Sequence, residues 1–197
     1  TIVNAPGDVI IGGRMDACNR ANVQIGRHRA YFLNNNVVNH CPEMNAYKDQ
    51  WLKLHRRPTR KVTNVRFYTG ATCSYYYPTA DKAAQSILGM ATQVLDFPRM
   101  IENAWNDGVR IFVEQGPLGR CTRWIGQILG DKEHLAVAMD ARERSSLDQL
   151  VHAIAKLKAG GVAIDINGFQ PNHWSQGEKA AETSNRRLMQ RYAVHPS

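Results

Sequence analysis

Apolar and polar positions alternate with different periods along the chain, and each period predicts an element. Residues 8–11 and 30–33 form short apolar runs, which are typical of strands. Residues 15–23, which lie between them, follow a weak helical period. Strand, helix and strand in so short a stretch make one βαβ-like or split βαβ element. Because such an element is too small to fold alone, we expect it to pack against another part of the protein.

Apolar positions spaced three and four residues apart predict a series of amphipathic helices after this element. The first stripe runs through residues 44–54, and Pro58 ends it. Thr79 is a suitable N-cap for the second helix. The remaining helices are expected within residues 95–108, 122–129 and 145–158.

Short apolar runs between these helices predict further strands, whereas residues 75–78, three tyrosines and a proline, are expected to form a loop. The alternation of strands and helices predicts an α/β fold with a mainly parallel sheet and helices on both faces. Residues 168–197 are polar and without period, and we expect them to form a tail. The predicted strands lie at residues 65–68, 109–113, 135–139 and 162–164.

One histidine lies where the pattern changes from strand to helix. His40 follows the run at residues 30–33 and precedes a helix expected to begin near Glu43. Pro42 suits the first turn of that helix, because its missing N–H has no partner to lose there. From such a corner an imidazole can project into a cleft and exchange a proton near neutral pH. The alternative is a corner histidine that hydrogen-bonds its own loop.

A glycine-rich turn lies between the strand at residues 109–113 and the helix at residues 122–129. Such a turn places backbone N–H groups at a helix N-terminus, where negative charge is favoured. Residues 114–119 match neither the dinucleotide pattern G-x-G-x-x-G nor a phosphate-binding P-loop. A simple tight turn between strand and helix is therefore the alternative.

The charge of the chain is positive and unevenly distributed. The 197 residues carry a net charge of +8, and 43% of them are hydrophobic. No apolar run approaches the roughly 20 residues that a membrane span needs. Without a zinc-finger, RNA-recognition or helix-turn-helix signature, specific nucleic-acid recognition has little support. One basic run forms either an exposed, solvated connection or a docking patch for an acidic partner: Lys53, Arg56, Arg57, Arg60 and Lys61.

The cysteines give no sign of a metal or disulfide framework. They are far apart and form no C-x-x-C pair, so we expect no metal site, and free thiols in a reducing cytoplasm. Cys41, beside His40, is not expected to act as a nucleophile, because adjacent residues usually point apart. The four cysteines are Cys18, Cys41, Cys73 and Cys121.

Several stretches together resemble the second half of malonyl/acyl-carrier-protein acyltransferase domains, as found in polyketide synthases and bacterial polyunsaturated fatty acid synthases. The likeness spans residues 1–167. The stretches that carry it, in chain order, are residues 4–13, 40–44, 95–100 and 111–117. The stretches that favour the polyunsaturated type are residues 119–125, 134–138 and 150–165.

The resemblance implies an α/β-hydrolase-like subdomain into which a small ferredoxin-like subdomain is inserted. Residues 1–36 would then be the end of the small subdomain. Residues 37–167 would be the C-terminal part of the large one, and residues 168–197 the polar tail.

The resemblance also implies the transfer of an acyl or malonyl group from coenzyme A to the phosphopantetheine thiol of an acyl carrier protein, with no permanently bound cofactor. Residues 40–44 match the family motif His-Ser/Cys-x-x-Met, so His40 would deprotonate a serine and later activate the carrier thiol. Backbone carbonyls orient this histidine in the family. A glutamine that some members carry nearby falls close to Met90 here.

The serine nucleophile of the family is not found in this sequence. It occupies a G-x-S-x-G elbow, and no serine here has that setting. The glutamine-containing oxyanion loop and the arginine that binds a malonyl carboxylate are not found either. We therefore expect the isolated chain, which begins at Thr1 without an initiator Met, to be an inactive fragment that needs the N-terminal half of the domain. The serines are Ser74, Ser86, Ser145, Ser146, Ser175, Ser184 and Ser197.

Two other functions remain open at this point. The chain can be a non-catalytic module that binds a carrier protein or a synthase neighbour through the basic run, since carrier proteins are usually acidic. Less well supported is a basic nucleic-acid-binding protein.

Overall fold

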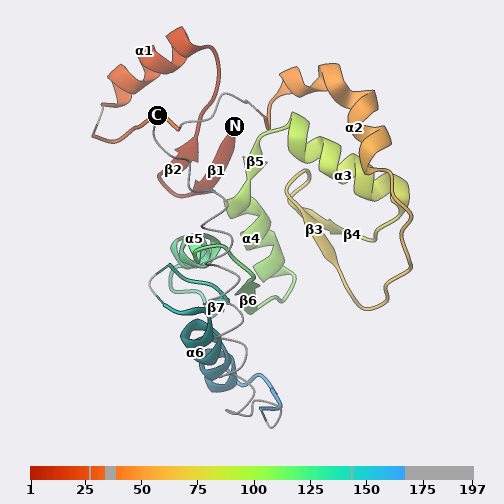
Figure 1. Ribbon diagram of the computed structural model, residues 1–197, viewed down its shortest axis with the longest axis vertical. Coiled ribbons are helices and arrows are strands. Elements are labelled where there is room, and N and C mark those ends of the chain that lie inside the picture. The colour runs from red at the N-terminus through yellow and green to blue at the C-terminus, as the bar shows by residue number, and fades with distance from the viewer. Residues whose placement is uncertain (27, 34–38, 143, 167–197) are drawn as a thin grey trace, which may run out of the picture. The chain divides into compact units, whose positions relative to one another are not determined.

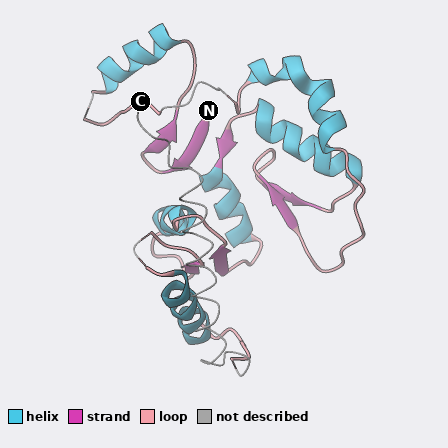
Figure 2. Cartoon of the chain, in the orientation of Figure 1, coloured by secondary structure: helices cyan, strands magenta, loops and turns pink. Residues whose placement is uncertain are grey.

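A computed structural model describes residues 1–26, 28–33, 39–142 and 144–166, and its elements are labelled in Figure 1. The chain divides into two units, Thr1–Lys156 and a second one that begins at Leu157. The predicted tail at residues 168–197 lies outside the described residues. Figure 2 shows helices and short strands following one another along the chain.

The first strands join the N-terminus to a strand from the middle of the chain. Strand β1 (Ile2–Ala5) pairs antiparallel with β2 (Asp8–Ile10) across a turn in which Gly7 has a φ of +77°, a conformation that glycine adopts at little cost. On its other side β1 pairs in parallel with β5 (Leu95–Asp96). This sheet therefore joins residues from both sides of the boundary expected at residue 36, which itself lies outside the described residues and stays a prediction.

The tyrosine run contributes a strand. Strand β3 (Phe67–Thr69) and strand β4 (Ser74–Tyr76) form an antiparallel hairpin, so the loop predicted from residue 75 onwards is wrong for Tyr75 and Tyr76. Cross-strand aromatic pairs explain the difference, because such pairs stabilise neighbouring strands. The ring centroids of Phe67 and Tyr76 lie 6.2 Å apart.

The best-packed part of the molecule is a strand–helix–strand unit covered by a second helix. Strands β6 (Ile111–Glu114) and β7 (Leu135–Ala138) are parallel, with α5 (Arg120–Leu129) between them in sequence. Helix α4 (Phe97–Asn106) packs against α5. Each large apolar side chain buried here contributes roughly 1.5–3 kcal/mol. The core comprises Ile101, Ile125 and Leu129, against which Phe97, Trp105, Phe112, Ile128 and Ala136 pack.

The remaining helices lie where helices were predicted, but the stripe at residues 44–54 is divided between a 3₁₀ helix and an α-helix. It is also not a buried stripe, because Tyr47 is 55% and Leu54 54% exposed. Helix α3 begins after Thr79, whose Oγ1 accepts a hydrogen bond from the backbone N–H of Lys82 at 3.2 Å, as the N-cap prediction requires. Within the described residues, no helix combines the length and apolar composition needed to cross a membrane. The other helices are α1 (Met15–Ile25), the 3₁₀ helix η1 (Pro42–Tyr47), α2 (Lys48–His55), α3 (Ala80–Thr92) and α6 (Ser146–Ala159).

Two predicted strands are wrong. Residues 30–33 and 162–164 have no strand structure and pair with no described strand. Apolar composition alone does not make a strand, because the backbone groups also need a neighbouring strand to bind. Tyr31 is 84% exposed, so this stretch is not packed as a buried strand would be.

The α/β class is confirmed, but the sheet is divided. The described strands form one three-stranded and two two-stranded sheets rather than one mainly parallel sheet. Parallel pairing occurs between β1 and β5 and between β6 and β7, as the alternation of strands and helices predicts.

Candidate active site

His40 lies at a sharp corner of the backbone. Its φ is 57°, in the left-handed region that histidine enters more readily than most residues and that is often found at functional sites. Residues 30–33 are not a strand, so the predicted strand-to-helix corner is instead a corner between loop and the 3₁₀ helix η1. Pro42 begins η1, as expected from its missing N–H.

The C-terminal end of α3 holds this corner. The last carbonyl groups of a helix have no partner within it. Here Nδ1 of His40 hydrogen-bonds the backbone oxygen of Met90 at 2.5 Å, and the N–H of Cys41 donates to the oxygen of Ala91 at 3.3 Å. Two neighbouring residues thus satisfy two consecutive carbonyls at the end of α3, which fixes the direction of the imidazole.

This contact determines which ring nitrogen of His40 can act as a base. A carbonyl oxygen only accepts hydrogen bonds, so Nδ1 must carry the proton. In the neutral ring Nε2 then has a free lone pair. Within the part of the chain that the structure describes, Nε2 has no hydrogen-bond partner, and the half-buried ring is not enclosed in the core. Such an arrangement would allow Nε2 to accept a proton.

Cys41 is engaged at the first turn of η1. Its side chain is buried and hydrogen-bonds the carboxylate of Glu43. The backbone N–H of Glu43 and the Cys41 thiol hold the pKa of that carboxyl below its usual range. This binding gives Cys41 a structural role beside the histidine.

The basic run lies along the end of α2 and the connection that follows. All five cations, Lys53, Arg56, Arg57, Arg60 and Lys61, are exposed. Nε of Arg56 lies 2.6 Å from Oδ1 of Asp81, at the start of α3. Because α2 packs against α3, the run belongs to the same group of helices that orients His40. Its role in docking stays a prediction.

The glycine-rich turn before α5 is occupied by carboxylates of the chain itself. Oε2 of Glu114 accepts hydrogen bonds from the backbone N–H of Thr122 at 2.6 Å and from its hydroxyl at 2.7 Å. Oδ2 of Asp140 accepts one from the N–H of Leu118 at 2.9 Å. Because carboxylates of the chain itself already bind these N–H groups, the simple strand-to-helix turn describes residues 114–119 better than an anion-binding site does. Burial, with the nearby Glu114 carboxylate, raises the pKa of the Cys121 thiol in the first turn.

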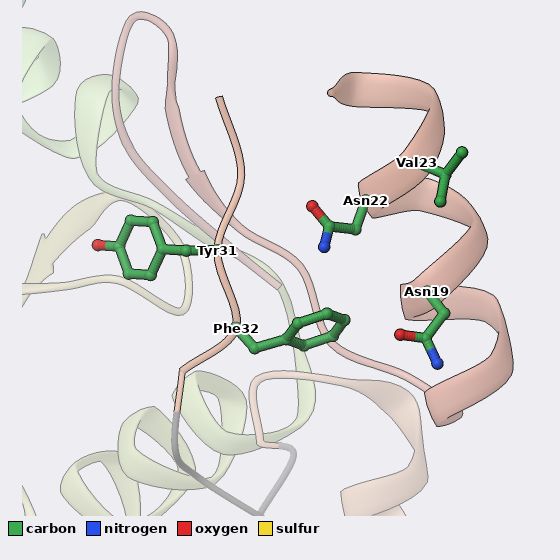
Figure 3. A pocket seen from close by; sticks show the side chains of 5 residues that line it. All are labelled: Asn19, Asn22, Val23, Tyr31 and Phe32. Atoms are coloured by element: carbon green, nitrogen blue, oxygen red, sulfur yellow. The ribbon is translucent and has the colours of Figure 1, made fainter. Parts of the chain in front are cut away.

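A pocket of about 420 Å³ beside α1 offers no catalytic chemistry. Asn19, Asn22 and Val23 line it from the helix, and Tyr31 and Phe32 from the segment that follows. Figure 3 shows both asparagines turned towards that segment, with Phe32 pointing towards α1 and Tyr31 away from it. Oδ1 of Asn22 is buried without a partner among the described residues. None of the lining side chains is a base or a nucleophile at neutral pH.

The described residues show neither a metal site nor a disulfide. Among residues 1–26, 28–33, 39–142 and 144–166, no group of three His, Cys, Asp or Glu side chains could hold a metal ion. None of the four cysteines, all of which are described, forms a disulfide.

Comparisons with known proteins agree on one fold. The chain is 26% identical over 170 residues, 81% of its length, to a polyunsaturated fatty acid synthase subunit from Thraustochytrium sp.. Its structure resembles the acyltransferase domain of the second module of the salinomycin polyketide synthase, with a TM-score of 0.72, 21% identity and 88% of this chain covered. It also resembles malonyl CoA-acyl carrier protein transacylase from Clostridium perfringens, with a TM-score of 0.64, 19% identity and 81% coverage.

The chain has the fold of part of the acyltransferase domains that it resembles. It spans 8% of the fatty acid synthase polypeptide, 41% of the salinomycin synthase domain and 50% of the clostridial transacylase. No family model matches the chain. The acyltransferase resemblance and the α/β class predicted from the sequence are thereby confirmed.

The contact between His40 and Met90 was only partly foreseeable. The local sequence pattern placed the histidine at a corner. It did not identify the hydrogen-bond partner of the histidine, which is 50 positions away in the chain. The acyltransferase resemblance did imply support by backbone carbonyls, but it named Met90 only as the position near which some members carry a glutamine. The structure shows that the carbonyl is that of Met90 itself.

Proposed function

We propose that the chain supplies the histidine-bearing part of an acyltransferase. This enzyme transfers an acyl or malonyl group from coenzyme A to the phosphopantetheine thiol of an acyl carrier protein. The observation that carries the proposal is the orientation of His40, whose Nδ1 is bound to the Met90 carbonyl while Nε2 has no partner among the described residues. A base held in this way needs no carboxylate partner.

The reaction then follows from proton transfers at Nε2 of His40. Nε2 takes the proton of a serine hydroxyl, whose oxygen attacks the thioester carbonyl. The carbon–sulfur bond breaks, and the coenzyme A thiol leaves with the proton from the imidazolium. In the second half Nε2 takes the proton of the carrier thiol, and the thiolate attacks the acyl-serine ester. The serine oxygen leaves and regains its proton from Nε2, so the cycle closes.

The serine must come from outside this chain, since no serine here lies in a G-x-S-x-G elbow. We infer that the segment or chain that carries it covers apolar surface left exposed on the strands. Strand β6 leaves Ile111 39% and Val113 44% exposed, and on its other edge pairs with no strand among the described residues. Exposed apolar side chains beside an unpaired edge are typical of a surface that binds another part of a protein.

Partners and location follow from the same proposal. The clostridial neighbour is named as a transacylase acting between malonyl CoA and an acyl carrier protein, so the proposed partners are a carrier protein and the serine-bearing segment. The exposed basic run is the proposed docking surface for the acidic carrier. Thiols without disulfides agree with the reducing cytoplasm in which we place the protein.

The test is covalent labelling with malonyl coenzyme A followed by mass spectrometry. We expect no acyl adduct on the isolated chain. We expect an adduct on the serine, and transfer to the carrier protein, when a related acyltransferase segment with a G-x-S-x-G elbow is co-expressed. The same segment with its elbow serine replaced by alanine is the control. A covalent adduct on the isolated chain would refute the proposed division of the catalytic residues.

A non-catalytic carrier-binding module is the second candidate, and the exposure of all five cations of the basic run favours it. Titration with an acidic carrier protein and with random DNA at equal ionic strength separates the candidates. Carrier binding with no transfer in the assembled protein supports the second candidate. Equal or tighter binding of DNA contradicts both.

A further inference from the structure

A second concave surface lies at the end of the β6–β7 unit, distinct in its residues from the His40 corner. It is a groove of about 370 Å³ whose wall includes Val137 and Ala138 of β7 and the loop that follows them. These residues form the carboxyl end of a parallel strand. In open α/β sheets, ligands bind outside the carboxyl ends of the strands.

The groove carries four basic side chains from two segments. Arg142 and Arg144 come from the loop after β7, and His152 and Lys156 from α6. The two residues of α6 are four positions apart, so they lie on the same face of the helix. All four lie within the first unit of the chain.

No carboxylate lines the groove among the described residues. Glu143, between the two arginines, lies outside the described residues. Of the described carboxylates nearby, Asp140 accepts the N–H of the lining residue Leu118 at 2.9 Å, and Asp148 accepts the hydroxyl of Ser145 at 2.7 Å. None of the four basic side chains forms an ion pair with a described carboxylate.

The walls of the groove are held by hydrogen bonds. The buried Gln149 donates from Nε2 to the backbone oxygen of Ala138 at 2.6 Å, which ties α6 to the end of β7. Thr122, which also lines the groove, is bound by Glu114. Burial and then the neighbouring Arg144 and Lys156 lower the pKa of His152. Like charges are thus kept close together on a fixed frame.

We propose that this groove binds the phosphate group of a small ligand. A phosphate offers several acceptor oxygens and a negative charge, and paired arginines recognise it through two parallel hydrogen bonds each. A concave surface of this size suits a small ligand, whereas the exposed basic run suits a protein surface. The binding of phosphate rests on the groove alone. Only the choice of coenzyme A as its source rests on the function proposed above.

The test is calorimetric titration of the full chain with three probes: coenzyme A, inorganic phosphate and pantetheine, which has no phosphate. We expect coenzyme A and phosphate to bind and pantetheine not to bind through the groove. Replacing Arg142 and Arg144 together by Gln weakens coenzyme A binding by about tenfold or more, because charge-assisted hydrogen bonds are lost. The control Arg57→Gln with Arg60→Gln removes the same charge and leaves the affinity within about twofold.

His152 reports the location of the ligand by NMR. A bound phosphate raises the pKa of His152, because its charge offsets Arg142, Arg144 and Lys156, while Asp148, one turn earlier on α6, stays bound to Ser145. Inorganic phosphate tests the groove without the acyl-transfer reaction, so a failure of the acyltransferase proposal and a failure of this one are distinguishable.

Three results overturn the proposal. One is the absence of coenzyme A and phosphate binding at millimolar concentration. Another is binding that the Arg142→Gln, Arg144→Gln variant does not weaken. The third is a loss of carrier-protein binding in that variant with coenzyme A binding intact, which would make the groove a protein-docking surface.

Discussion

Two helix ends in this molecule show how a helix terminus becomes, or fails to become, a reactive site. At the C-terminal end of α3, the carbonyls of Met90 and Ala91 bind His40 and Cys41 from far back in the chain, and the second imidazole nitrogen has no partner among the residues that the structure describes. At the N-terminal end of α5, the amide of Thr122 is bound by Glu114 from the preceding strand. The backbone groups at both helix ends have hydrogen-bond partners. Only the partner at the end of α3, the His40 imidazole, has a second nitrogen that can accept a proton.

The largest effect is expected at the end of α3. In the acyltransferase assembled with its serine-bearing segment, His40→Ala should lower the rate of transfer to the carrier protein by about 100- to 10,000-fold, the usual contribution of a general base. The control is His55→Ala, since the His55 ring lies tilted against Trp51 with ring centroids 5.2 Å apart and has no proposed catalytic role. Steady-state transfer of labelled malonyl groups measures both. Equal transfer rates for His40→Ala and the parent protein would contradict the claim that the end of α3 holds a reactive histidine.

An intermediate effect is expected at the start of α5. Glu114→Ala leaves the N–H of Thr122 without its charged partner and should lower the free energy of unfolding by about 1.5–3 kcal/mol. Denaturant unfolding measures the loss. The control Glu102→Ala, at an exposed position of α4, should change stability by less than about 0.5 kcal/mol. A loss at Glu114 no larger than at Glu102 would show that the carboxylate does not hold this helix end.

The smallest effect concerns the thiol in the first turn of α5. Burial and the Glu114 carboxylate both raise the pKa of Cys121, so its thiolate forms at higher pH than that of an ordinary thiol. Glu114→Gln removes the negative charge, lowers this pKa and shifts the curve of alkylation rate against pH towards lower pH. Mass spectrometry of iodoacetamide-treated protein measures it, with Cys18 as the internal reference. An unmoved curve would mean that burial alone sets the pKa of Cys121.

The sequence predicted those elements whose signals are local. The Thr79 cap, the stripes of α4 and α6, and the apolar runs of β6 and β7 depend on neighbouring residues only. Strand β4 was missed because its tyrosines are stabilised by rings on the opposite strand, which local pattern does not show. The strand predicted at residues 30–33 failed for the converse reason, since apolar residues there have no strand to pair with.

The same distinction applies to the sites. His40 was placed at a corner by Pro42 and the change of pattern, whereas its bond to Met90 is a tertiary contact. The family resemblance implied a backbone carbonyl as the partner but not which one. The basic groove was not found at all, because its cations lie on two segments. A signal was available in the sequence. Two arginines follow a buried strand, and the helix after them carries His152 and Lys156 four positions apart on one face.

The central claim is that the carbonyl of Met90 fixes the proton of His40 on Nδ1 and leaves Nε2 as the base. Nitrogen-15 NMR of the histidine rings in the full chain, at a pH where the imidazole is neutral, measures the position of this proton directly. We predict the Nδ1–H tautomer for His40. The Nε2–H tautomer, or the mixture of tautomers typical of an unrestrained histidine, would contradict the account.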